Sequence, residues 1–256
     1  MNGSDEKVSE HEQEQFVASM YSCLPWELRH HINTFCVQNS YDDEVIVRRG
    51  RGDKPMLLVR QSVGTHSYHW TEDSTLQQLS PDRIGLQASR EMLETYYGTR
   101  TFKFIQDELE CVQSFLATDA FGLTLRPADH LRRLHLQVQP FAYARLEDPE
   151  MKLNKKQTCC RALESLDALR SPRTMIEVHV DLAEWSCDED ESDMMLDDAS
   201  SFMYLIIKTT EALQTSGVKI KLILEGSWGE RNGVELCSSS IPSLGECVTI
   251  MKTAYQ

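Results

Sequence analysis

Apolar residues recur at helical spacing near the start of the chain. They stand three or four positions apart at Phe16, Met20, Leu24, Leu28, Ile32 and Phe35. This spacing places apolar side chains on one face of a helix. Pro25 stands where a proline is tolerated, in the first turn of a helix. The pattern predicts a helix over Pro25 to Val37, with a shorter helical segment before it.

The apolar period then changes from helical to strand-like. Two short runs, Val45 to Val47 and Met56 to Val59, flank a basic turn that contains two glycines. Apolar runs on both sides of a glycine-rich turn are typical of a β-hairpin. The polar and aromatic stretch 62–75 is expected to be a loop.

A second helical pattern spans Pro81 to Tyr97. Ser80 is a suitable N-cap, and Gly98 is expected to end the helix in a left-handed conformation. A short strand over Thr101 to Phe104 should follow, and then a helix from Asp107 to about residue 117.

Three later runs alternate apolar and polar residues, and they resemble one another. They are Leu131 to Val138, Met175 to Leu182 and Val218 to Leu224. Helical patterns at roughly 155–169 and 196–216 separate them, and connections of this length predict parallel strands. The fold class is therefore α/β, with an N-terminal helix and hairpin followed by a β-α-β-α-β parallel sheet.

The spacing and the alternation of these runs add two expectations. Leu134, Val178 and Leu222 are separated by equal intervals of 44 residues, which suggests an irregular, leucine-rich-repeat-like arrangement. Strict alternation predicts that helices cover one sheet face while the other stays partly open, as a place where a partner can bind. Edge strands are expected at Val234 to Leu236 and Cys247 to Ile250.

The net charge of -14 is concentrated in two segments. Residues 1–14 carry five acidic residues and one lysine, and residues 174–207 carry ten acidic residues without lysine or arginine. The rest of the chain has no basic cluster of the kind that nucleic acids or anionic membranes require, so neither is an expected partner. We expect a disordered acidic tail over 1–15 and one globular unit over 16–256.

An acidic loop is expected over 188–198. Its residues do not fit a calcium loop, because Asp193 stands where the EF-hand needs glycine and Ala199 where it needs glutamate. Acidic segments of this density act as interaction sites for basic proteins. The predicted partner-binding residues are Asp188, Glu189, Asp190, Glu191 and Asp193.

The chain has no pattern of a secretory signal or a membrane span, and its eight cysteines are scattered. Reduced thiols in the cytoplasm or nucleus fit this distribution. His66 and His69 are three residues apart, but an isolated pair is weak evidence for a metal. No catalytic motif is present, so we expect no catalytic residue, no metal and no cofactor.

Two motifs resemble those of the fungal F-box-like proteins. The first is Leu24-Pro25-Trp26-Glu27-Leu28-Arg29-His30-His31-Ile32, which matches a Leu-Pro-x-Glu-Leu-Arg-x-x-Ile opening helix. The second combines the Ser89-Arg90-Glu91 helix with the strand motif Tyr97-Gly98-Thr99-Arg100-Thr101-Phe102-Lys103-Phe104. The run Leu131 to Leu136 resembles the β-run that follows in that family. The resemblance divides the globular unit into an F-box-like part, 16–104, and an α/β part, 105–256.

The resemblance implies a protein-binding module, as in an F-box-like substrate receptor of a ubiquitin ligase. In that family the Leu-Pro helix docks on a Skp-type adaptor, and the implied contact residues are Leu24, Pro25, Leu28 and Ile32. The chain departs from the family pattern after Val37, where strands replace further helices. Two alternatives stay open: an orphan intracellular scaffold whose Leu-Pro helix is purely structural, and an enzyme whose site is not visible in the sequence.

Overall fold

A computed structural model describes most of the chain. The described residues are 15, 17–38, 43–51, 54–63, 67–169, 173–182, 192–225, 234–236, 245, 246 and 249. The chain divides into two compact units. The first comprises Met1–Val45, Met56–Thr101 and Leu116–Arg132, and the second comprises Ile46–Pro55, Phe102–Phe115 and Arg133–Gln256.

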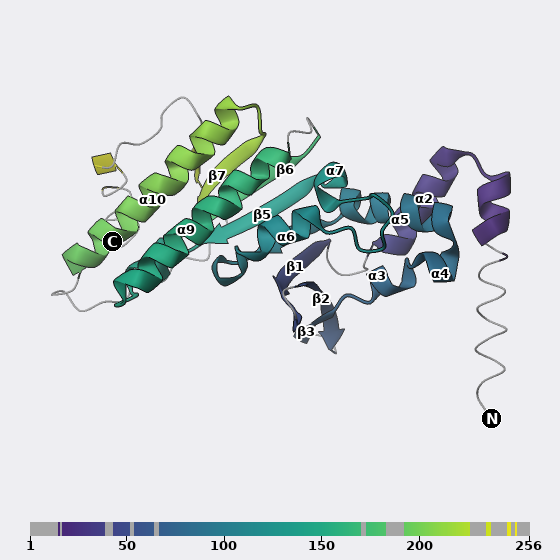
Figure 1. Cartoon of the computed structure of the whole chain (residues 1–256), viewed down its shortest axis with the longest axis horizontal. Helices are drawn as coiled ribbons and strands as arrows, with labels where there is room; N and C mark the ends of the chain where they lie inside the picture. Colours follow the sequence, from purple (N-terminus) through teal and green to yellow (C-terminus); the bar gives the residue numbers. More distant parts are fainter. Residues whose placement is uncertain are drawn as a thin grey trace. The chain divides into compact units, whose positions relative to one another are not determined.

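The first unit is mainly helical (Figure 1). Its helices are α2 (Trp26–Val37), α3 (Thr75–Gln78), α4 (Pro81–Ile84), α5 (Leu86–Thr99) and α7 (Pro127–His130). It also holds most of the hairpin of β2 (Pro55–Val63) and β3 (Ser67–Glu72). The helix predicted to start at Pro25 begins one residue later, because Pro25 is the N-cap with an extended backbone.

The loop predicted over 62–75 is wrong, because Ser67–Glu72 is a strand. It pairs antiparallel with β2, and Arg60 lies opposite Trp70. The guanidinium carbon of Arg60 lies 4.0 Å from the ring centre of Tyr68 and 5.4 Å from that of Trp70. Aromatic residues favour strands, and the cation–π contacts add to the pairing.

The helix predicted over Pro81 to Tyr97 is broken at Gly85. Gly85 has φ 80° and ψ 157°, a backbone region that only glycine adopts readily, so α4 ends and α5 begins there. Ser80 caps α4 as predicted, since its side chain accepts a hydrogen bond from the Asp82 N–H. The left-handed cap predicted at Gly98 is wrong, because Gly98 lies inside α5, which ends at Thr99.

The second unit carries a sheet with helices packed on it (Figure 1). Its strands are β1 (Glu44–Arg49), β4 (Thr101–Phe104), β5 (Arg133–Val138), β6 (Met175–Asp181), β7 (Ile220–Glu225) and β8 (Val234–Leu236), in the order β1-β4-β5-β6-β7-β8. Its helical segments are η2 (Gln106–Glu108), α6 (Cys111–Ala117), α8 (Pro140–Ala144), α9 (Pro149–Ser165), η3 (Leu166–Ala168) and α10 (Ser192–Thr215). The predicted hairpin turn after β1 is closed by the Gly50 N–H, which donates to the Lys54 carbonyl at 2.8 Å.

The three alternating runs form parallel strands, and the α/β class is confirmed. β5 pairs with β6 and β6 with β7, both in parallel. The register places Leu136, Val178 and Leu222 side by side, so Leu134 is not the equivalent of Val178. The equal spacing of 44 residues is therefore wrong in the first interval. The true partner of Val178 lies two residues after Leu134. Because side chains alternate between the two faces of a strand, a shift of two residues leaves every side chain on its predicted face.

The two faces of this sheet differ in burial. One set of alternate positions in β5, β6 and β7 is apolar and buried: Leu134, Leu136, Val138, Ile176, Val178, Val180, Ile220, Leu222 and Leu224. The helices α9 and α10 lie side by side along these strands (Figure 1). The alternate positions of β6, including Glu177, His179 and Asp181, are only partly buried. One face is thus covered and the other partly open, as the alternation predicts.

Helices α9 and α10 begin earlier than expected, whereas the helix predicted from Asp107 begins only at Cys111, after the 3-10 turn η2. α9 starts at Pro149, where Asp148 is the N-cap and accepts a hydrogen bond from the Glu150 N–H. α10 starts at Ser192, so residues 192–198 of the predicted acidic loop are helical. Asp198 is held by an ion pair with Lys152 of α9. Over residues 192–198 the helix therefore replaces the predicted loop, while 188–191 lie outside the described residues.

The C-terminal expectations are met in part. β8 pairs antiparallel with β7 as the predicted edge strand, with Glu235 opposite Ile223. The strand predicted over Cys247 to Ile250 is wrong at Thr249, which is helical, while 247, 248 and 250 lie outside the described residues. Within the described residues, no helix combines the length and the apolar character that a bilayer crossing needs.

Candidate functional site

The Leu-Pro helix α2 has an inner face that packs within the first unit. Asn33 and Val37 are buried on this face, and α2 contacts α5. Arg29 extends from α2 to Glu91 of α5 and donates two hydrogen bonds to its carboxylate, of 3.1 Å from Nε and 3.0 Å from Nη2. A paired guanidinium and carboxylate fix both distance and orientation, so the inner face of α2 is firmly positioned.

The outer face of α2 leaves large apolar side chains exposed. Leu28 is 51% exposed and Phe35 is 83% exposed. These residues are seven positions apart, which places them on one side of a helix. Of the other predicted contact residues, Pro25 is exposed and Leu24 and Ile32 are partly exposed. The structure therefore places the four predicted adaptor-contact residues on or beside a face that the first unit leaves accessible.

Arg29 also holds the chain that enters α2. Its Nη1 donates to the Leu24 carbonyl at 2.8 Å, and its guanidinium carbon lies 4.9 Å from the ring centre of Tyr21. The Arg29 side chain thus contacts the turn before α2, the Tyr21 ring of the preceding helical segment and the Glu91 carboxylate of α5. The conformation of Leu24 and Pro25 depends on these contacts.

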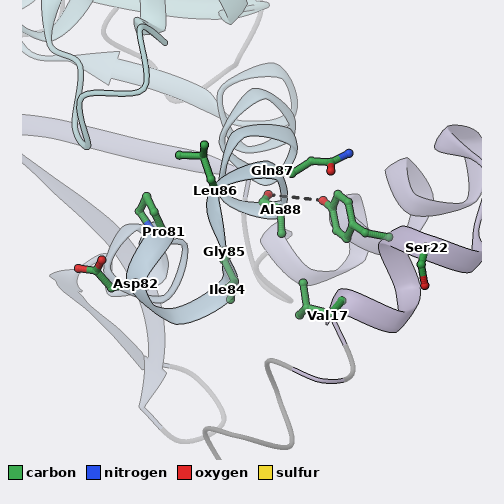
Figure 2. Close-up of a pocket in the computed structure, with 11 residues that line it drawn as sticks. Val17, Ser22, Pro81, Asp82, Ile84, Gly85, Leu86, Gln87 and Ala88 are labelled. Atoms are coloured by element: carbon green, nitrogen blue, oxygen red, sulfur yellow. Dashed lines mark hydrogen bonds between the residues drawn. The ribbon is translucent and has the colours of Figure 1, made fainter.

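A pocket of about 570 Å³ lies between the helical segment 17–23 and the start of α5. Figure 2 shows Val17, Pro81, Leu86 and Ala88 around it, and its dashed line marks the hydrogen bond from the Tyr21 hydroxyl to the Ala88 carbonyl at 3.5 Å. Burial raises the pKa of the Tyr21 phenol. Among the described residues that line this pocket, Asp82 is the sole carboxylate, and none is a histidine or cysteine.

The predicted acidic contact residues fall mostly outside the described part of the chain. Residues 188–191 are not among the described residues. Asp193 lies in the first turn of α10, but its side chain is not described. Their role in binding a basic partner stays a prediction. His66 also lies outside the described residues, and His69 is an exposed residue of β3.

The partly open sheet face of the second unit holds a cluster that the sequence reasoning missed. His135 of β5 and Glu177 and His179 of β6 offer one ligand atom each within 4.8 Å of one another. The Glu177 Oε2 atom lies 3.0 Å from His135 Nε2 and 3.3 Å from His179 Nε2. Two imidazole nitrogens therefore converge on one carboxylate oxygen.

A fourth residue orients the second histidine. The Nδ1 atom of His179 lies 2.7 Å from Glu225 Oε1 at the end of β7. The side chains of His135 and His179 are 26% and 19% exposed, so solvent reaches the cluster. Nitrogen and oxygen donors in this arrangement are able to bind a divalent transition-metal ion or to share protons.

The residues of this cluster can be identified from the sequence only when the pairing register of the strands is known. His135, Glu177 and His179 occupy polar positions of the alternating runs, and Glu225 directly follows the last run. Only strand pairing shows that His135 stands beside Glu177, since the register joins these two positions directly.

The chain matches no protein-family model, no curated protein and no solved structure. Its fold places it among α/β proteins.

Proposed function

We propose that this chain is a protein-binding module that docks through the outer face of α2 on a Skp-type adaptor of a ubiquitin ligase, in the cytoplasm or nucleus. The observation that carries the proposal is the exposure of Leu28 and Phe35, at 51% and 83%, on the helix that resembles an F-box opening. In this role, the remaining chain captures the substrate.

The exposed stripe has the chemistry of a helix that binds in a groove. Single exposed apolar residues are common on protein surfaces and need no explanation. Here Leu28, Ile32 and Phe35 follow one another at helical spacing, as the anchors of groove-binding helices do. Moving a fully exposed side chain of this kind from water into an apolar groove contributes about 1.5–3 kcal/mol, and the gain is smaller for Leu28 and Ile32, which are already partly covered.

The inner contacts of α2 support the same proposal. The Arg29–Glu91 pair fixes α2 on α5, so the outer stripe is presented without unfolding the first unit. A helix that is already ordered loses less conformational entropy on binding than one that must fold first. The alternative of a purely structural Leu-Pro helix would bury these apolar side chains in the chain's own core.

The test is a binding measurement with the full chain and a purified Skp-type adaptor. Wild type should bind, and Leu28→Asp should lose binding because it places a charge in the apolar contact. Leu153→Asp is the matched control, since Leu153 lies on α9 and is 54% exposed. It introduces the same charge at a similar exposure outside the proposed contact.

Circular dichroism should show that both variants keep the wild-type fold, because substitutions at exposed positions usually change stability by about 0.5 kcal/mol or less. Phe35→Ala should weaken binding as well, by removing a second anchor. The proposal is wrong if wild type does not bind the adaptor, or if folded Leu28→Asp binds as tightly as Leu153→Asp.

A further inference from the structure

The cluster on the partly open sheet face brings carboxylate oxygens against both ring nitrogens of His179. A neutral imidazole carries one N–H, yet both ring nitrogens of His179 face carboxylate oxygens, Nδ1 at 2.7 Å from Glu225 and Nε2 at 3.3 Å from Glu177. With the proton on Nδ1, a lone pair of Nε2 points at a lone pair of Glu177. A metal cation placed between them, or a second proton on the ring, removes this repulsion.

We propose that His135, Glu177 and His179 bind one Zn²⁺ ion and that Glu225 holds His179 in the tautomer that binding requires. Zinc accepts two histidines and a carboxylate as three protein ligands and keeps a fourth position for water. Calcium and magnesium prefer oxygen ligands alone, so a site with two imidazoles favours a transition-metal ion such as zinc over either of them.

The distances between the donor atoms fit one shared ion. Ligand atoms about 2.0–2.2 Å from a tetrahedral zinc ion are roughly 3.3 Å from one another. The Glu177 Oε2 atom is 3.0 Å from His135 Nε2 and 3.3 Å from His179 Nε2. The ligand atoms of His135 and His179 lie within 4.8 Å of each other, so the partly exposed side chains must rotate to bring all three onto the ion.

Glu225 supplies the outer contact that zinc-binding histidines usually have. A ligating histidine donates its other N–H to a carboxylate or carbonyl, which fixes the ring and makes the ligating nitrogen more basic. The 2.7 Å contact from His179 Nδ1 to Glu225 has this geometry. Glu225 belongs to β7, so the site joins side chains of the three adjacent strands β5, β6 and β7.

The test is a calorimetric titration of the full chain with ZnCl₂ after removal of metals by chelation. Wild type should bind one ion per chain. His135→Ala and His179→Ala should each lose most of this binding, and Glu225→Gln should weaken it by about 10- to 100-fold. Lys221→Gln is the matched control, because Lys221 pairs with Glu177 in the register and provides no ligand atom of the proposed site. It should bind at least as tightly as wild type.

Two further measurements distinguish zinc bound by these histidines from zinc bound by the cysteines. Co²⁺ in place of Zn²⁺ should produce no thiolate charge-transfer absorption, which excludes cysteine ligands. The imidazole NMR signals of two histidines should shift at one equivalent of Zn²⁺. Both shifts should be absent in the double variant that combines His135→Gln and His179→Gln. Circular dichroism of each variant verifies folding. The proposal is overturned if wild type binds no zinc, if the histidine variants bind as tightly as wild type, or if the thiolate band appears.

Discussion

Arg29 donates two hydrogen bonds to Glu91, although the two residues are 62 positions apart in the chain. Arg29 belongs to the motif that resembles an F-box opening, and Glu91 belongs to the Ser-Arg-Glu helix of the second motif. The two motifs therefore meet through one ion pair in the first unit. This contact gives a physical reason for the pair of residue types, and that reason does not depend on the proposed docking.

Glu91→Ala should loosen α2 from α5. Without the carboxylate, Arg29 loses its partner on α5, while its bond to the Leu24 carbonyl alone does not hold the helix in place. We expect faster hydrogen exchange of the amides of α2, with β5 to β7 unchanged, and weaker binding of the adaptor. Hydrogen-exchange mass spectrometry and the binding assay measure the two effects.

Glu94→Ala is the control for this prediction. Glu94 forms an exposed pair with Arg90 on the same helix, at 3.9 Å. Exposed pairs of this kind contribute little, so exchange in α2 should stay at the wild-type rate. Equal exchange in both variants would show that the Arg29–Glu91 pair does not position α2.

Tyr96→Phe should destabilise the first unit by about 1–3 kcal/mol. The buried Tyr96 hydroxyl donates a 2.7 Å hydrogen bond to Asp73 Oδ2. The variant leaves this carboxylate oxygen without its phenol donor, while the other oxygen keeps its bond from the Thr75 N–H at 2.9 Å. Denaturant unfolding of wild type and variant at neutral pH gives the difference.

The same pair predicts a dependence on pH. Burial, and then the charge of Asp73, raise the pKa of Tyr96 well above 10. The folded state therefore favours the protonated phenol, and this contribution is complete below pH 10 and falls as the pH rises beyond it. The loss is about 1.4 kcal/mol per pH unit, so the stability difference between wild type and Tyr96→Phe should shrink above pH 10. A difference that stays constant would mean that Tyr96 does not titrate as described.

Two glycines of the first unit should respond to alanine with opposite signs. Gly85 has φ 80°, so Gly85→Ala should destabilise by about 1–3 kcal/mol through backbone strain, although space is open around it. Gly98 is helical, and a Cβ there would lie 3.7 Å from Arg132 Nε, an ordinary contact. Gly98→Ala should therefore stabilise by roughly 0.5–1 kcal/mol. Thermal unfolding of the two variants measures both effects, and a stabilised Gly85→Ala would contradict the assigned conformation.

Local patterns in the sequence predicted several elements because short-range physics determines them. The Pro25 helix, the Ser80 cap and the three alternating runs depend on spacing and on the chemistry of single residues. The strand Ser67–Glu72 was missed since its stability comes from Arg60 and the pairing with β2. The break at Gly85 was missed because a glycine inside a helical pattern does not reveal its backbone angles.

The sequence by itself determined the α/β class, the face of each strand that enters the core, and the helix whose outer side chains we propose as a contact. Those properties follow from the periodicity of apolar residues, which the order of neighbouring residues determines. Only the tertiary structure decided that Arg29 meets Glu91 and that His135, Glu177, His179 and Glu225 form one cluster. Both arrangements join residues that lie far apart in the chain, and they depend on helix packing and strand register, which periodicity leaves open.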